Sequence, residues 1–258
     1  MQNNTFSTLF VGQNLIKLKE VDSTNNFLKD LVSKSEPLAE GTVIMADNQF
    51  AGRGQQESVW QTQAGKNIST SIYLKPSFLP LDKQFYLNMA VSLAVSDALS
   101  CFVPDGIKVK WPNDMYYRDK KLGGILIENT LTGASIRSSV IGIGLNVNQE
   151  EFSESISQKA TSVIQILQKD VPLMDIMAKI FMFLEKYYLI LRAGKYSILQ
   201  NDYLAKLYNL NVSSLYKQHG EIFEGMIRGV EDSGRLMVEI RGELKAFNFK
   251  EIEFTHTK

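Results

Sequence analysis

The stretch that decides the fold reads KVKWPNDMYYRDKKLGGILIE and covers residues 108–128. Apolar and polar residues alternate from Ile107 to Trp111, which is typical of a half-buried strand. Turn-forming residues at 112–114 break that run. The pattern predicts three short strands, at 107–111, 115–117 and 122–127.

Polar and glycine residues gather around these strands. Gly123 and Gly124 lie inside the third strand, where glycine weakens a sheet unless a ligand or another backbone approaches closely. The charged and amide residues expected at one end of this sheet are Lys110, Asn113, Asp114 and Lys121. A basic hairpin can also be a plain solvated edge, so the choice depends on similar stretches elsewhere in the chain.

Composition describes an ordinary globular protein. The chain has 258 residues, of which 44% are hydrophobic, and this allows one large domain and one small one. Lys+Arg and Asp+Glu both number 28, so bulk charge predicts neither a nucleic-acid partner nor an acidic membrane. The lone Cys101 excludes an internal disulfide and a Cys-rich zinc site. His219 and His256 match no metal-ligand spacing.

The N-terminal residues and the apolar runs bear on location. The sequence begins MQNNTFSTLF, without the basic stretch and apolar core of a signal peptide. No apolar run reaches the ~18 residues of a membrane span. We therefore expect a cytoplasmic protein with no membrane partner.

Two polar stretches precede the hairpin. Residues 22–25, Asp-Ser-Thr-Asn, lie between a predicted strand and a predicted helix that ends near Lys34. They are either a plain helix N-cap or a hydrogen-bonding cluster that faces a polar ligand. Residues 49–60, QFAGRGQQESVW, predict a mobile surface loop whose backbone N–H groups can wrap phosphates. Trp60 fits either a packing anchor or a stacking partner for a planar base.

Further elements follow the hairpin. Residues 135–148 predict a strand in which Gly142 and Gly144 share one face and leave a slot, with Asn146 continuing on that face. Helices are expected at about 81–100, 162–168, 172–194 and 196–207. Beyond residue 210, regularly spaced glycines predict a small β-barrel of about 45 residues.

The ordered motifs resemble those of the biotin protein ligases, over nearly the whole chain. They are DSTNN (22–26), Gln49 with AGRG (51–54) and Trp60, KWPND (110–114), KKLGGILIE (120–128) and GIGLNVN (142–148). The resemblance implies an α+β fold: a mixed, mainly antiparallel sheet flanked by helices, as in class II synthetase catalytic domains. It places this catalytic domain in residues 1–208 and an SH3-like β-barrel in residues 209–258.

The resemblance also implies a two-step reaction. ATP and biotin give biotinyl-5′-adenylate, and a lysine of a biotin carboxyl carrier protein domain then takes the biotin. ATP, biotin and Mg²⁺ are the implied cofactors, with the metal ligands unknown. The implied catalytic residues are Lys121, Arg53 and Lys110. The implied biotin-binding residues are Ser23, Thr24, Asn25, Gln49, Arg53, Gly54, Gln55, Lys121, Gly124, Ile125, Gly142 and Gly144. The implied ATP-binding residues are Arg53, Trp60, Lys110, Asn113, Lys121 and Asn146.

The chain departs from the family pattern in the loop. The family often has GRGRRG, whereas this chain reads GRGQQE, with Gln55, Gln56 and Glu57 in place of basic and glycine residues. A glutamine can donate hydrogen bonds but cannot neutralise phosphate, so we hypothesise a looser hold on the adenylate. The other readings are a lipoate or octanoate ligase of related fold and a non-enzymatic biotin- or nucleotide-binding module.

Partners beyond the carrier domain are only partly constrained. Some family members carry an N-terminal DNA-reading domain, but 22 residues precede Ser23, too few for a helix-turn-helix. We therefore expect no nucleic-acid binding. Family members occur as monomers and as homodimers, and the sequence does not choose between them. It also leaves open the role of the barrel and the identity of the acceptor carboxylase.

Overall fold

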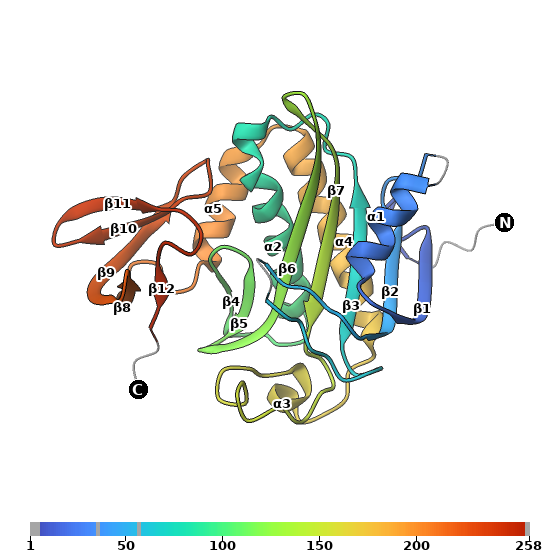
Figure 1. The fold of residues 1–258 in the computed structure, drawn as a ribbon, viewed down its shortest axis with the longest axis horizontal. Coiled ribbons are helices and arrows are strands. Elements are labelled where there is room, and N and C mark those ends of the chain that lie inside the picture. Colours follow the sequence, from blue (N-terminus) through green and yellow to red (C-terminus); the bar gives the residue numbers. More distant parts are fainter. Residues whose placement is uncertain (1–5, 35–36, 56–57, 256–258) are drawn as a thin grey trace.

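Two β-sheets organise the chain in the computed structural model, which describes residues 6–34, 37–55 and 58–255 (Figure 1). The larger sheet has seven strands in the order β1-β2-β3-β7-β6-β5-β4, and the smaller has five in the order β11-β10-β9-β8-β12. Within the larger sheet β1 and β2 are parallel, and the other neighbouring strands are antiparallel. The predicted α+β class, with a mixed and mainly antiparallel sheet, is confirmed.

The strands of the two sheets are as follows. The larger sheet contains β1 (Leu15–Val21), β2 (Val43–Gln49), β3 (Ile68–Leu74), β4 (Ile107–Lys110), β5 (Asp114–Tyr117), β6 (Lys120–Thr132) and β7 (Ser135–Leu145). The smaller sheet contains β8 (Ser213–Gln218), β9 (Glu221–Val230), β10 (Leu236–Ile240), β11 (Glu243–Phe247) and β12 (Glu253–Phe254). The small sheet lies at one end of the molecule, beside β4 and α5 (Figure 1).

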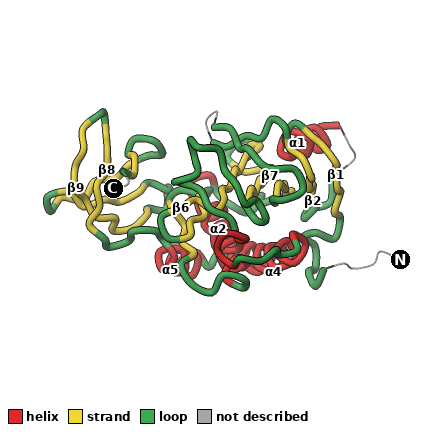
Figure 2. The backbone as a smooth tube through the Cα atoms, turned by 90° about the horizontal axis from the view of Figure 1, so that it is seen from below, coloured by secondary structure: helices red, strands yellow, loops and turns green. Residues whose placement is uncertain are grey.

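Helices cover both faces of the larger sheet. They are α1 (Thr24–Lys34), the 3₁₀ helix η1 (Leu81–Lys83), α2 (Phe85–Ser100), α3 (Val163–Leu167), α4 (Leu173–Arg192) and α5 (Tyr196–Lys206). Seen along the sheet, α2, α4 and α5 gather on one side and α1 lies on the other (Figure 2). The single helix predicted at 81–100 is thus divided into two elements, the short η1 and the longer α2.

The two helical layers follow from alternation along the strands. In β2, Val43 and Met45 belong to the large core that contains α2 and α4. Ile44 points the other way and packs with Leu28 of α1 in a second, smaller cluster. Because side chains of a strand alternate between faces, a fully apolar run such as this needs a cover on each side.

The predicted hairpin is confirmed, with shifted ends. β4 stops at Lys110, one residue short of the expected end, because Trp111 already belongs to the turn before Pro112. β6 continues to Thr132, well past Ile127, because β7 pairs with it along that whole length. The long β6–β7 pair lies at the centre of the sheet and carries the KKLGGILIE motif and most of the GIGLNVN motif.

The small sheet is fastened to the large one through the turn after β9. Trp111 Nε1 donates a hydrogen bond to the Gly234 carbonyl at 2.9 Å. The hydroxyl of Tyr86 donates to Asp232 at 2.6 Å, and Lys83 forms an ion pair with the same carboxylate. Gly234 has φ +93°, and a Cβ there would lie 2.5 Å from the Phe85 ring, so this turn requires glycine.

The helices of the described chain are not membrane spans. Within residues 6–34, 37–55 and 58–255, no helix is both long enough and apolar enough to cross a bilayer.

Candidate active site

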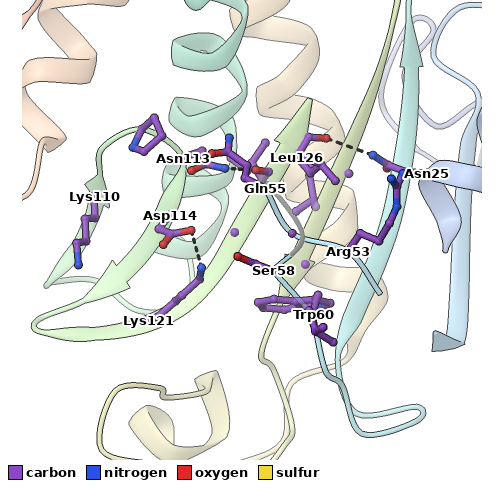
Figure 3. A pocket seen from close by; sticks show the side chains of 18 of the residues that line it. Asn25, Arg53, Gln55, Ser58, Trp60, Lys110, Asn113, Asp114, Lys121 and Leu126 are labelled. Carbon is purple, nitrogen blue, oxygen red and sulfur yellow. Dashed lines mark hydrogen bonds and ion pairs between the residues drawn. The ribbon is translucent and has the colours of Figure 1, made fainter. Parts of the chain in front are cut away.

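A cavity of about 300 Å³ opens on the α1 side of strands β3, β7 and β6 (Figure 3). The 52–60 loop covers it from one side, and the turn after β4 borders it from another. The predicted site residues that line it are Ser23, Thr24, Asn25, Gln49, Arg53, Gly54, Gln55, Trp60, Lys110, Asn113, Lys121, Gly124, Ile125, Gly142 and Gly144. All five quoted motifs of the sequence therefore meet at one place.

Neutral hydrogen-bonding groups form one wall. The backbone N–H of Thr24 donates to Gln49 Oε1 at 2.9 Å, and its hydroxyl lies 3.2 Å from the same oxygen. Ser71 Oγ on β3 lies 2.8 Å from Thr24 Oγ1 and 2.5 Å from Asn25 Oδ1. These side chains are buried. The 22–25 stretch therefore makes hydrogen bonds to distant strands at the start of α1 and lines the cavity.

Two glycines of β7 make room for neighbouring side chains. A Cβ on Gly142 would lie 2.5 Å from Asn25 Oδ1. A Cβ on Gly144 would lie 2.5 Å from the Trp60 indole. The slot predicted from these glycines is thus bordered by Asn25 and Trp60.

The 52–60 loop is more regular than the sequence predicted. Gly54 N donates to the Ser58 carbonyl at 2.6 Å, and Trp60 N donates to the Gly52 carbonyl at 2.9 Å. An antiparallel bridge joins Arg53 to Val59. Residues 52–54 and 58–60 therefore pair as the two arms of a short hairpin, which we call the 52–60 hairpin. Two of the three departures from the family pattern, Gln56 and Glu57, lie outside the described residues.

Two buried polar atoms in this hairpin have no hydrogen-bond partner among the described residues. They are Gln55 Oε1 and Trp60 Nε1, and both residues line the cavity. Buried polar groups are normally paired because leaving one unpaired costs free energy. An acceptor and a donor are thus available here for a ligand.

Cations gather at the opposite end of the cavity. Lys121 Nζ on β6 lies 2.7 Å from Asp114 Oδ1 on β5. Lys110 Nζ donates to the hydroxyl of Tyr116 at 3.0 Å, and it lies 4.8 Å from the centre of the Phe254 ring. Burial lowers the pKa of Lys110 to about 8; the charge of Asp114 opposes this shift and that of Lys121 adds to it.

Asn113 and Asn146 use their side-chain amides to hold the framework. Asn113 Nδ2 donates to the Ile125 carbonyl, which ties the turn after β4 to β6. Asn146 Nδ2 donates to the Thr161 carbonyl at 3.1 Å, and Asn146 is buried. Asn146 is not among the residues that line the cavity. β7 ends at Leu145, so strand alternation no longer determines where Asn146 points.

Arg53 lies apart from Lys121, on the Asn25 side of the cavity (Figure 3). Its Nη2 donates to Glu128 Oε1 at 3.1 Å and to Oε2 at 3.2 Å. Lys29 Nζ and Asn25 Nδ2 donate to the same carboxylate, at 2.7 Å and 2.8 Å. Burial opposes ionisation of Glu128, but these bonds and the charge of Arg53 outweigh it and lower its pKa. The sequence prediction gave Glu128 no role, although it ends the KKLGGILIE motif.

The small sheet supplies a further wall that the sequence did not predict. The cavity-lining residues from this region are Phe249, Lys250, Ile252, Glu253 and Phe254. Nothing in the local sequence marks them, because they reach the cavity only through the docking of the small sheet. Ser69 of β3 is another lining residue that sequence reasoning missed. Asp114 was expected beside Lys121 at one end of the sheet, but it was given no role at the ligand.

Metal-ligating side chains do not cluster in the described part of the chain. No group of three or more His, Cys, Asp or Glu residues there could hold a metal ion. The carboxylates that border the cavity are Asp114 and Glu253.

Comparison with known proteins agrees with this geometry. Residues 18–146 match the Biotin/lipoate A/B protein ligase family. The bifunctional ligase/repressor BirA of Bacillus spizizenii is 29% identical over 248 residues, covering 95% of this chain and 75% of that protein. The biotin–[acetyl-CoA-carboxylase] ligase of Mycobacterium tuberculosis is 28% identical over 239 residues, covering 90% and 86% respectively.

A solved structure extends the likeness to three dimensions. The biotin protein ligase from Aquifex aeolicus, in complex with biotin and ATP, superposes with a TM-score of 0.79 at 27% identity. The match covers 95% of this chain and 99% of that one, so it includes both sheets. The chain belongs to the Biotin/lipoate A/B protein ligase family.

Proposed function

We propose that this chain is a biotin protein ligase. It activates biotin with ATP to biotinyl-5′-adenylate, releases pyrophosphate, and transfers the biotinyl group to a lysine of a carrier domain. The observation that carries the proposal is the shared cavity, in which a neutral hydrogen-bonding wall faces a cationic end. A ureido ring needs neutral donors and acceptors, and a carboxylate beside phosphates needs cations.

Each end of the cavity suits one part of the substrates. The buried groups of Thr24, Asn25 and Gln49 fit the ureido ring of biotin. Lys121 and Lys110 fit the carboxylate and the α-phosphate, where both charges must be neutralised for attack to occur. Trp60 borders the cavity from the 52–60 hairpin and fits a stacking role against adenine.

Magnesium fits this scheme as a companion of ATP. Mg²⁺ keeps several waters and prefers phosphate oxygens together with one or two carboxylates. Asp114 borders the cavity beside Lys121 and is the carboxylate best placed to approach such an ion. When bound, the ion adds positive charge against the phosphates.

The acceptor and the cellular setting rest on the sequence alone. We expect the acceptor to be an exposed lysine of a biotin carboxyl carrier protein domain. The cytoplasmic location, the choice between monomer and homodimer, and the domain boundary after residue 208 stay predictions.

Pyrophosphate–ATP exchange tests the activation step directly. Purified protein with Mg²⁺ and labelled pyrophosphate receives biotin, lipoate or octanoate in separate reactions. We expect label to enter ATP with biotin and not with the other two acids. Exchange with lipoate or octanoate alone would move the chain to another branch of its family. A folded sample that exchanges with none of the acids would indicate a binding module without activity.

A further inference from the structure

The guanidinium of Arg53 is paired with a carboxylate outside the cavity lining. It donates to both oxygens of Glu128 and lies on the side of the cavity away from Lys121 (Figure 3). These bonds turn the guanidinium toward β6 and away from the cationic end of the cavity. We propose that Glu128 is a positioning residue that anchors the 52–60 hairpin over the cavity through Arg53.

The two partners suit an anchor because they come from different parts of the fold. Glu128 lies on β6 opposite Val140 of β7, in the longest strand pair of the sheet. Arg53 lies 75 positions earlier in the chain, in the 52–60 hairpin. The contact therefore joins the 52–60 hairpin to the long β6–β7 strand pair. Arginine suits this task because its planar fork fixes direction as well as distance.

Two further donors hold the carboxylate in place. Lys29 Nζ donates to Glu128 Oε1 at 2.7 Å, and Asn25 Nδ2 donates to Oε2 at 2.8 Å. The remaining end of the Asn25 amide lies 2.5 Å from Ser71 Oγ. Glu128 thus orients one residue of the neutral wall and one residue of the hairpin at the same time.

The anchor has a direct consequence for the hairpin. Arg53 pairs with Val59 across the hairpin, and Trp60 follows immediately and packs on Gly144. Fixing Arg53 therefore also fixes the part of the hairpin that carries the two unpaired cavity atoms. With its side chain turned to Glu128, Arg53 acts on the ligand through the placement of this segment. A hairpin that stays in place shields biotinyl-5′-adenylate, a mixed anhydride, from water and slows the release of this intermediate.

A double-mutant cycle tests the anchor, and it rests on the proposed function. The variants are Glu128→Gln, Arg53→Gln and the double variant, and the measurement is the release rate of preformed biotinyl-5′-adenylate. The Arg53–Glu128 pair is partly exposed, so we expect each single change to speed release by up to about fivefold. The double variant should release no faster than Glu128→Gln alone, because that change already removes the partner of Arg53.

Lys29→Gln is the matched control, because it removes a partner of Glu128 and leaves Arg53 bound. Lys29 lies on α1, outside the 52–60 hairpin, so its loss should change release by less than about twofold. Additive effects of Glu128→Gln and Arg53→Gln, or an effect of Arg53→Gln without one of Glu128→Gln, would overturn the anchor and give Arg53 a direct role at the ligand. No effect of either change would also overturn the anchor.

Limited trypsin digestion gives a readout that needs no activity. Trypsin cuts after Arg53 only when the hairpin opens, so mass spectrometry can follow the peptide that ends there. We expect Glu128→Gln to speed this cut by up to about fivefold, as for loss of a partly exposed ion pair, whereas Lys29→Gln should leave it nearly unchanged. Equal rates in Glu128→Gln and the wild type would contradict the anchor. If the wild type shows no biotin-dependent exchange, the proposed function fails, and this digestion still decides the anchor by itself.

Discussion

Two ion pairs border the cavity, and they use their cations in different ways. Lys121 pairs with Asp114 across the adjacent strands β5 and β6, and both residues line the cavity. Arg53 pairs with Glu128 across a wide gap in sequence, and Glu128 is not among the lining residues. In our proposal Lys121 of the first pair faces the ligand, whereas Arg53 of the second pair holds the 52–60 hairpin in place.

The comparison teaches that residue type alone does not assign a role. A lysine and an arginine in two separate motifs both fit phosphate binding when only the sequence is considered. Their carboxylate partners distinguish the two roles. Asp114 lies inside the cavity, so an incoming phosphate can replace it as the partner of Lys121, whereas Glu128 lies outside the lining. The following variants test this division, from the largest expected effect to the smallest.

Loss of Lys121 should be the most damaging change. Lys121→Ala removes the cation that faces the carboxylate and phosphates, so pyrophosphate–ATP exchange should fall by at least about 100-fold. Far-UV circular dichroism should be unchanged, because the side chain is partly exposed and takes no part in the core. Lys120→Ala is the matched control, since Lys120 precedes it on β6 and is exposed. Equal exchange in Lys121→Ala and Lys120→Ala would remove Lys121 from the mechanism.

The pH profile should report Lys110. Its folded pKa of about 8 lies below the ordinary value of 10.5, so its charge disappears as pH rises through about 8. We expect kcat/KM for ATP to fall over that range, because this ratio follows ionisations of the free enzyme. Lys110→Gln should have low activity without this descending limb. If the limb persists unchanged in Lys110→Gln, another group titrates there.

The same shift has a defined sign for stability. Between pH 8 and 10.5 the unfolded chain holds the proton of Lys110 more firmly than the folded chain does. The contribution of this group to the free energy of unfolding therefore rises with pH across that window. Chemical denaturation of the wild type and of Lys110→Gln at both ends of the window measures this difference.

Trp60→Ala should weaken nucleotide binding more than biotin binding. Loss of a stacking surface for adenine should raise the KM for ATP roughly fivefold or more. The KM for biotin should change less, because Thr24 and Gln49 remain in place. Trp60→Phe keeps an aromatic face and should recover most of the loss. A larger change for biotin than for ATP would place Trp60 against biotin instead.

Gln55→Arg should have the smallest effect of the series. It restores a cation to the hairpin at a position where Gln55 Oε1 is buried and unpaired. We expect adenylate release to slow by about threefold, as for one partly exposed charge contact. An unchanged release rate would show that the glutamine does not loosen the hold on the adenylate.

Much of the fold was predictable because its elements have strong periodicity. The alternation from Ile107 to Trp111 and the apolar stripe of α4 each fix an element without tertiary information. The ordered motifs likewise gave most of the cavity lining. Boundaries such as the end of β6 were not predictable, because pairing with β7 decides where that strand stops.

The parts of the site that were missed depend on contacts between distant segments. Glu128 and Arg53 meet only once the hairpin lies over the sheet. Phe249 and Phe254 reach the cavity only because the small sheet docks on α2 and Trp111. Alternation along the strand was expected to keep Asn146 on the face of the glycine slot, but β7 ends one residue before it. Its side chain bonds the Thr161 carbonyl instead of lining the cavity.

Transfer of biotin to a carrier domain is the most direct measurement of the central claim. Purified chain, biotin, ATP and Mg²⁺ are incubated with an isolated biotin carboxyl carrier domain, and mass spectrometry follows the carrier. We predict a mass gain of one biotinyl group on a single lysine, dependent on ATP and absent with Lys121→Ala. An unmodified carrier in the presence of folded chain, or a gain that appears with lipoate and not with biotin, would contradict the account.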